Sequence, residues 1–303
     1  MTAVEIPATD LVAPVRVAVL GTGAIGQDLV HKALRSPVLD CALVAGRNPE
    51  SAGLRHAARL GCPTSADGVD AILAAERFAV VFDATSAAAH AEHRRLLEPL
   101  GTLLVDLTPS KLGRMVVPTV TGVPECADIS LVSCGGQAAV PVAHALAGRY
   151  RVEYLEAVST VASTIAGRAT RINLDEYVAT TRQALSEFTG VRDTKAILNI
   201  SPAVPPATFR TAVRAIVPGA EVEEVRAAVS TAAKAVRTFA PGYEVLGCTV
   251  TGDRVVVSVE VTANSDVLPH YAGNLDIINA AAILAAEQHA GRLARSARTG
   301  VHR

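Results

Sequence analysis

The chain has 303 residues, of which 50% are hydrophobic and 19% are charged, and its formal net charge is −1. This length gives room for two ordinary domains with apolar cores of their own, and the balanced charge lacks the basic excess that nucleic-acid binding normally requires. No apolar run approaches the length of a membrane span, and five scattered cysteines with no signal-peptide pattern favour a soluble protein of the reducing cytoplasm.

Strand patterns alternate with helical patterns along the first 130 residues. Residues 1–14 have the character of a flexible extension that ends at a proline. Short apolar runs typical of buried strands lie at 15–20, 41–46, 79–85 and 102–109. Because helical spacing follows the first run and recurs at 49–60, the pattern predicts an α/β protein. Its N-terminal domain, residues 15–132, is expected to be a Rossmann doubly wound parallel sheet.

The pattern changes in the second half of the chain. Strand-like segments lie at 154–164, 195–201 and 254–263, and helical segments at 174–188, with Asn173 as its N-cap, and at 221–239. We therefore expect an α+β catalytic and oligomerisation domain over residues 133–274, with helices on one face of its sheet. A long helix over residues 275–303 is expected to return to the first domain.

Three glycines follow the first predicted strand. Gly21, Gly23 and Gly26 form a G-x-G-x-x-G pattern between a strand and a helix. The first glycine permits a tight turn, the second lets backbone approach a diphosphate, and the third lets helix and strand pack closely. This context predicts a dinucleotide site, with a βα turn that binds no ligand as the alternative.

The end of the second predicted strand carries an arginine where an NAD site usually has an acid. That acid normally binds the ribose hydroxyls, but the sequence here is Gly46-Arg47-Asn48. An arginine suits a 2′-phosphate, so the sequence leaves NADP open beside NAD. A solvated surface role for Arg47 is an equally good interpretation.

Cys134 lies between a short apolar strand, residues 129–132, and a predicted helix. The glycines beside it leave room for a ligand, and a helix N-terminus is expected to lower the pKa of the thiol. Backbone amides around Gly135–Gln137 are candidates for an oxyanion site. From position and spacing alone, a buried structural cysteine is the more common alternative.

Several other polar residues gain no functional role from the sequence. Asp83 and Asp106 end predicted strands, where ligands often bind, but such residues more often cap the next helix. His90 and His93 are three positions apart on a predicted helix, with no third ligand at a suitable spacing. We therefore predict no metal site.

Five motifs occur in order along the chain: GTGAIG, FDATSAAAH, DLTP, SCGGQA and YAGNLDI. In these five motifs and their order, the chain resembles the acylating acetaldehyde dehydrogenases. Those enzymes act with 4-hydroxy-2-oxovalerate aldolase in the bacterial catabolism of aromatic hydrocarbons. The resemblance runs from about Val15 to the last helix. It implies oxidation of a short aldehyde to its acyl-CoA thioester by NAD and coenzyme A.

The resemblance also implies roles for individual residues. Cys134 matches the residue that carries the acyl thioester. Thr22, Gly23, Ala24 and Ile25 match the phosphate loop, and Asn274 matches an asparagine near the nicotinamide. The loop matching a cofactor-contacting stretch is Ile165, Ala166, Gly167, Arg168, Ala169, Thr170, Arg171, Ile172 and Asn173. A homodimer and an aldolase partner are implied as well.

The chain departs from the family pattern at positions that bear on activity. Thr211 follows Arg210 where the family has an aspartate that is proposed to help activate the cysteine, and a neutral hydroxyl cannot act as a general base at neutral pH. His270 is a candidate replacement, although a surface or packed histidine is the more common case. Ile165, Arg168 and Ala169 also depart from the usual loop.

Two alternatives therefore remain open at this point. The first is a semialdehyde dehydrogenase of the same fold that passes the acyl group to another acceptor. The second is a diverged nucleotide-binding paralogue with little activity, or one that only supports an aldolase.

Overall fold

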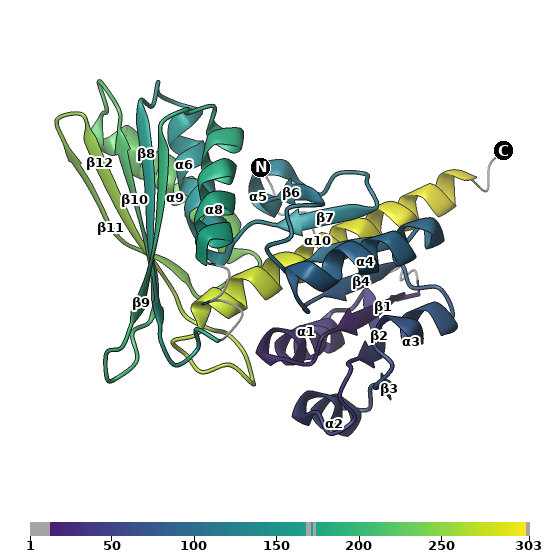
Figure 1. Ribbon diagram of the computed structural model, residues 1–303. Coiled ribbons are helices and arrows are strands. Elements are labelled where there is room, and N and C mark those ends of the chain that lie inside the picture. The colour runs from purple at the N-terminus through teal and green to yellow at the C-terminus, as the bar shows by residue number, and fades with distance from the viewer. Residues whose placement is uncertain (1–12, 168–170, 172–173, 301–303) are drawn as a thin grey trace.

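The computed structural model describes residues 13–167, 171 and 174–300. Most of the predicted N-terminal extension, residues 1–12, lies outside this range. Two sheets, each with its own helices, are bridged by one long C-terminal helix (Figure 1). None of the helices in the described ranges combines the length and apolar character that a membrane crossing needs.

The first sheet is parallel throughout and has the order β3-β2-β1-β4-β5-β7-β6. Its strands are β1 (Val15–Leu20), β2 (Leu39–Ala45), β3 (Thr64–Ser65), β4 (Val80–Asp83), β5 (Leu103–Asp106), β6 (Arg114–Val116) and β7 (Asp128–Leu131). Its helices are α1 (Ala24–Arg35), α2 (Ala52–Arg59), α3 (Val69–Ala74), α4 (Ala87–Leu97), the 3-10 turn η1 (Glu98–Leu100) and α5 (Pro118–Thr121).

Helices cover both faces of this sheet, which confirms the predicted doubly wound fold. Val17 and Val19 of β1 pack in one apolar core with α1 and the C-terminal helix. The alternate residues Ala18 and Leu20 face the opposite core, with α3 and α4. Because β1 is buried on both sides, its sequence is apolar at nearly every position instead of alternating.

The second sheet is mixed and has the order β11-β12-β10-β8-β9. Its elements are α6 (Cys134–Ala147), β8 (Tyr154–Ala162), α8 (Leu174–Thr189), β9 (Thr194–Ser201), β10 (Phe209–Ile216), α9 (Val222–Arg237), β11 (Tyr243–Thr251) and β12 (Arg254–Val261). Helices α6, α8 and α9 lie on one face of it, as predicted (Figure 1). Strands β10 and β11 were not predicted; β10 pairs with both β8 and β12 at the centre of the sheet.

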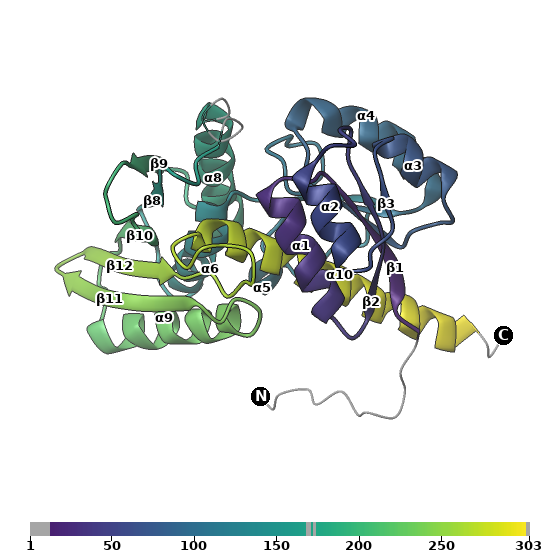
Figure 2. The same cartoon turned by 90° about the horizontal axis from the view of Figure 1, so that it is seen from below.

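The long helix α10 (Gly273–Gly300) joins the two cores. Ile277 packs in the core of the second sheet, and Ile278 packs in the core under β1. Asn279 donates from its side-chain amide to the Ile25 carbonyl at 3.2 Å and to Asp28 at 2.7 Å. These bonds fix α10 against α1 (Figure 1, Figure 2), so the start of α10 and the start of α1 meet at the same end of the parallel sheet.

Candidate active site

The loop between β1 and α1 has the geometry of a diphosphate cradle. Gly21 adopts φ +115°, which L side chains rarely adopt. A methyl group on Gly26 would lie 2.0 Å from the Gly21 carbonyl oxygen, so only glycine permits this close packing of helix on loop. Gly23 faces open space, with no atom within 4 Å of an added Cβ. The backbone N–H groups at the start of α1 are therefore open to a phosphate, and the loop fits a dinucleotide.

The next turn supports this loop from the side. Thr22 accepts a hydrogen bond from Ser51 at 2.8 Å, and Gly53 lets α2 approach the Thr22 carbonyl, which an added Cβ would meet at 2.1 Å. Arg47 is the second residue after β2 and is exposed. Asn48 accepts a bond from the Glu50 N–H at 3.0 Å and so closes a turn. An exposed cation at this point is available to the outer end of a dinucleotide.

Cys134 is the first residue of α6, and Ser133 caps this helix by accepting from the Gly136 N–H at 3.0 Å. The thiol opens into a cleft between the carboxyl ends of the parallel strands and the second sheet. The cleft is lined by Ile25, Ala84, Thr85, Ser86, Leu107, Thr108, Pro109, Leu131, Ser133, Cys134, Val161, Tyr177, Thr180, Leu198, Asn274, Leu275 and Ile278. Carboxyl ends of parallel strands are where open α/β sheets bind ligands.

The predicted fall in the pKa of Cys134 is wrong for the protein without ligands. Burial raises the pKa of Cys134 to about 11, although the Tyr177 hydroxyl and the backbone at Gly135 act in the opposite direction. Surrounding atoms thus desolvate the thiol, even though Cys134 as a residue is only partly buried. Desolvation disfavours a thiolate, and it outweighs the helix terminus here.

The predicted oxyanion site also changes. The Gly136 N–H is bonded to the Ser133 hydroxyl, and the Gln137 N–H is bonded to the Ser133 carbonyl at 2.8 Å. Both amides therefore serve the helix cap and are not directed at a substrate. The amides of Cys134 and Gly135 lie beside the sulfur instead, where they can meet charge that develops next to it.

Asn274 lies in the first turn of α10 and lines the cleft that holds Cys134. Its side-chain oxygen is buried, with no hydrogen-bond partner among the described residues. A buried polar atom without a partner is costly. The Asn274 amide faces the cleft with an oxygen free to accept a hydrogen bond, so it is suited to bind a polar group of a ligand.

The predicted cofactor loop is described in part. Ile165, Ala166 and Gly167 follow β8, and Arg171 donates to the Ala166 carbonyl at 2.9 Å and to the Ser163 carbonyl at 3.2 Å. None of these four predicted residues lines the cleft around Cys134. Arg168, Ala169, Thr170, Ile172 and Asn173, including the predicted N-cap of α8, lie outside the described residues.

Thr211 and His270 occupy different settings. Thr211 is 1% exposed on β10, and its hydroxyl lies 2.9 Å from the Ser159 hydroxyl on β8. His270 is exposed, its carbonyl accepts from the Ala263 N–H at 2.9 Å, and it is not among the residues that line the cleft. The structure thus gives the candidate base His270 no contact with the cleft.

Asp83 has a different role from helix capping. The N-cap of α4 is Ser86, which accepts from the Ala89 N–H at 3.3 Å. Asp83 instead bonds Thr85, His90 at 2.9 Å and His93 at 2.8 Å. Although burial acts to raise it, the bonds from both histidines and Thr85 hold the pKa of Asp83 below its usual range. This buried network fixes a loop that lines the cleft.

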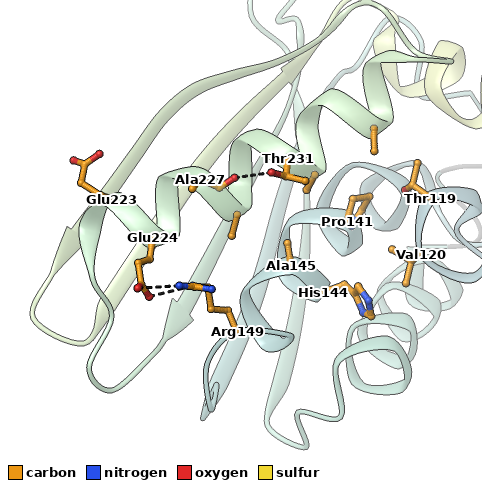
Figure 3. A pocket seen from close by; sticks show the side chains of 13 residues that line it. Thr119, Val120, Pro141, His144, Ala145, Arg149, Glu223, Glu224, Ala227 and Thr231 are labelled. Atoms are coloured by element: carbon orange, nitrogen blue, oxygen red, sulfur yellow. Dashed lines mark hydrogen bonds and ion pairs between the residues drawn. The ribbon is translucent and has the colours of Figure 1, made fainter. Parts of the chain in front are cut away.

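A second, wider hollow lies between α6 and α9 (Figure 3). Five alanines are among the residues that line it, Arg149 pairs with Glu224 at 2.8 Å, and Glu223 pairs with Arg226 at 3.0 Å. His144 bonds the Phe188 carbonyl at 2.6 Å. Because these side chains already bond other groups of the protein, they are less available to a ligand than the Cys134 thiol and the Asn274 amide in the cleft.

Tyr177 and Ser159 belong to the candidate site and were not predicted. Both lie against Gly135, where an added Cβ would meet the Tyr177 hydroxyl at 2.0 Å and the Ser159 hydroxyl at 2.5 Å. In the sequence, Tyr177 is one residue of an ordinary amphipathic helix and Ser159 one residue of a strand. No local spacing marks either of them, because only the fold brings them to Cys134.

Comparisons with known proteins identify one family of relatives. Residues 134–269 match the family described as "Prokaryotic acetaldehyde dehydrogenase, dimerisation". The acetaldehyde dehydrogenase of Streptomyces griseus is 66% identical over 294 residues, which cover 96% of each chain. That of Pectobacterium atrosepticum is 46% identical over 286 residues, which cover 92% of this chain and 97% of the relative.

Solved structures show the same fold at low sequence identity. Aspartate semialdehyde dehydrogenase II of Vibrio cholerae superposes with a TM-score of 0.61 over 93% of this chain and 99% of that one. The two sequences are 12% identical, so the likeness concerns the arrangement of the two sheets and not the substrate.

Proposed function

This chain belongs to the acetaldehyde dehydrogenase family, and from that premise we propose that it converts acetaldehyde or another short aldehyde to the acyl-CoA thioester. The observation that carries the proposal is the position of Cys134. Its thiol opens into a cleft that is also lined by Ile25 of the nucleotide loop and by Asn274 of α10. A nucleophile, a cofactor loop and an unpartnered amide therefore converge on one space.

The oxidant in this proposal is a nicotinamide dinucleotide. Gly21, Gly23 and Gly26 would hold the diphosphate at the start of α1, and Asn274 would face the nicotinamide half, as the family resemblance implies. When bound, the nicotinamide supplies an acceptor for a hydride. We propose NAD first, and Arg47 makes NADP the cofactor to test beside it.

The chemistry begins at the Cys134 sulfur. The sulfur forms a bond to the aldehyde carbon as the carbonyl π bond breaks, and the thiol proton ends on the former carbonyl oxygen. Loss of a hydride, for which the nicotinamide would be the acceptor, and of the hydroxyl proton to solvent leaves an acyl thioester on Cys134. The coenzyme A thiol then attacks the thioester carbonyl, Cys134 leaves with the pair of electrons of the broken bond, and the proton of the coenzyme A thiol ends on the Cys134 sulfur.

Apolar side chains surround the thiol and suit both a small aldehyde and a labile thioester. Leu107, Leu131, Val161, Leu198 and Leu275 line the cleft from five different elements or loops. Walls of this kind exclude water, which reduces hydrolysis of a reactive intermediate. The thioester therefore survives until a second thiol arrives.

We propose that the protein acts as a homodimer through its second domain, the part that matches a dimerisation family. The face of the second sheet that α6, α8 and α9 leave open is a suitable contact surface (Figure 1). An aldolase partner, as the family resemblance implies, is part of the same proposal. Light scattering and co-purification with a 4-hydroxy-2-oxovalerate aldolase test the two statements separately.

The function is tested with a panel of aldehydes, each assayed with NAD and NADP, with and without coenzyme A. We expect reduced cofactor to form only when coenzyme A is present, and acyl-CoA to appear by mass spectrometry. Cys134→Ala is expected to abolish turnover and retain cofactor binding, whereas Cys248→Ser on β11 is the matched control. Normal turnover by Cys134→Ala contradicts the proposal.

Two other results would replace the proposal with a rival. If phosphate or water substitutes for coenzyme A as the acyl acceptor, the enzyme is of the semialdehyde dehydrogenase type. If the protein binds nucleotide but oxidises no aldehyde, it is a diverged paralogue.

A further inference from the structure

Neutral hydroxyl groups gather behind the sulfur of Cys134. The Tyr177 hydroxyl is buried and lies beside Cys134 and Ser159, yet among the described residues it has no partner at full hydrogen-bonding geometry. Gly135 makes room for it, because an added Cβ there would lie 2.0 Å from the Tyr177 oxygen. Because residue 135 is glycine, the Tyr177 hydroxyl can lie against the first turn of α6.

The protons of the neighbouring hydroxyls can be assigned from their acceptors. Thr181 donates to the Tyr177 carbonyl at 2.7 Å. Its hydroxyl lies 2.5 Å from that of Ser133, so Ser133 must donate its proton to Thr181. Ser133 also accepts from the Gly136 N–H. Ser133 therefore has no proton left for Tyr177, and Ser159 is the hydroxyl that remains to donate to it.

Ser159 is itself supported from behind. Its oxygen lies 2.9 Å from the Thr211 hydroxyl, and both residues are 1% exposed on the adjacent strands β8 and β10. In a series of hydrogen bonds with one direction, Thr211 donates to Ser159, Ser159 donates to Tyr177, and Tyr177 donates to the sulfur. Aligned donors polarise one another, so such a chain is a stronger donor than one hydroxyl.

Among the described residues, the influences on the Cys134 thiol come from neutral groups: burial by the surrounding atoms, the Tyr177 hydroxyl and the backbone at Cys134 and Gly135. The position where the family pattern has an acid is Thr211, which cannot accept a proton at neutral pH. In this described surrounding, the groups that can stabilise a thiolate are hydrogen-bond donors.

We propose that Tyr177 is a further catalytic residue, which donates a hydrogen bond to the Cys134 sulfur and is held in place by the positioning residues Ser159 and Thr211. The inference rests on the proposed function, in which Cys134 is the nucleophile. Tyr177 keeps its own proton throughout, since burial raises its pKa well above the usual value. It stabilises negative charge on sulfur both when the thiol attacks and when Cys134 leaves from the thioester.

The test is alkylation of Cys134 by iodoacetamide in the full-length protein, followed by mass spectrometry of its peptide between pH 7 and pH 9. In Tyr177→Phe we expect the thiolate fraction to fall about tenfold, the effect of losing one hydrogen bond to a charged group. Because a more basic thiolate is more nucleophilic, the net rate of alkylation falls about threefold. The same loss is expected in kcat for the aldehyde, with little change in KM for the cofactor.

Matched variants separate this role from a structural one. Ser159→Ala and Thr211→Val are expected to slow alkylation in the same direction but less, and Thr211→Ser, which keeps the hydroxyl, restores the wild-type rate. Tyr150→Phe is the control, because the Tyr150 hydroxyl is at the surface and bonds Glu224 at 2.9 Å.

Equal alkylation rates in Tyr177→Phe and the wild type overturn the inference. If Tyr177→Phe does not fold, as judged by circular dichroism, wild-type rates in both Ser159→Ala and Thr211→Val overturn it instead. The assay needs no turnover. A wild-type protein that makes no acyl-CoA therefore defeats the proposed function, while the alkylation comparison still decides the role of Tyr177.

Discussion

His90 Nδ1 lies 2.9 Å from Asp83 Oδ2, and both side chains are fully buried behind the loops that line the cleft. Two further carboxylates face the same imidazole, Asp106 at 3.6 Å and Asp128 at 3.5 Å. Burial alone lowers the pKa of His90, but bonds to Asp128 and Asp83 and the charge of Asp106 raise it to about 10. His90 is therefore a buried cation that holds together Asp83 and Asp106, which end β4 and β5, and Asp128, which begins β7.

We predict that His90→Gln destabilises the protein by about 3–5 kcal/mol, since it removes the buried cation that Asp83 and Asp106 share. A raised pKa in the folded state means that His90 contributes its full stability below pH 6.5, its ordinary value, and that this contribution is lost as pH rises toward about 10. Urea unfolding of both proteins at pH 6 and pH 9 measures the difference, which should shrink at pH 9. A constant difference, or an equal loss in the exposed control His144→Gln, contradicts the assignment.

Gly135→Ala tests the packing around the nucleophile. The new methyl group would lie 2.0 Å from the Tyr177 hydroxyl and 2.5 Å from that of Ser159, so we expect a loss of about 1–3 kcal/mol in unfolding free energy. Displacement of Cys134 should lower aldehyde turnover by up to about a hundredfold. Adding Tyr177→Phe removes the nearer oxygen and should recover part of the stability. Gly291→Ala in α10, whose Cβ meets Arg295 only at 3.6 Å, is the control.

The alkylation rate of Cys134 in the protein without ligands is expected to rise about tenfold per pH unit from pH 7 to pH 10. The reason is that burial raises its pKa to about 11, so the thiolate fraction grows throughout this range. Iodoacetamide labelling with peptide mass spectrometry measures the rate. A plateau near pH 8.5 contradicts this account, because it indicates a thiol in an ordinary environment.

Local patterns were sufficient for the central strands of the nucleotide-binding half, but the short edge strands β3 and β6 were not predicted. Strand β1 and the glycines Gly21 to Gly26 are contiguous, and buried parallel strands are apolar at almost every position. Strand β10 was missed, although Phe209, Thr211, Val213 and Ala215 alternate with outward residues as a half-exposed strand requires. The polar Thr211 on the buried side and two arginines weakened that signal.

The candidate site was predictable only where its residues belong to contiguous motifs. Cys134 and the glycine loop met that condition, but the hydroxyls of Ser159, Tyr177 and Thr211 come from three separate elements. The sign of the pKa shift on Cys134 was wrong because the helix terminus is visible in the sequence, whereas the desolvation that outweighs it depends on the closed tertiary fold.

Substitution by alanine is expected to weaken cofactor binding at Gly23 and to lower the free energy of unfolding at Gly26. Gly23→Ala places a methyl group in open space, so the free energy of unfolding should stay nearly unchanged while NADH binds about tenfold or more weakly, because the methyl blocks the diphosphate. Gly26→Ala drives a methyl group to 2.0 Å from the Gly21 carbonyl, so stability itself should fall. Urea unfolding and NADH fluorescence titration measure the two effects. Wild-type NADH affinity in Gly23→Ala would mean that the diphosphate does not bind across this turn, even if the protein oxidises aldehydes.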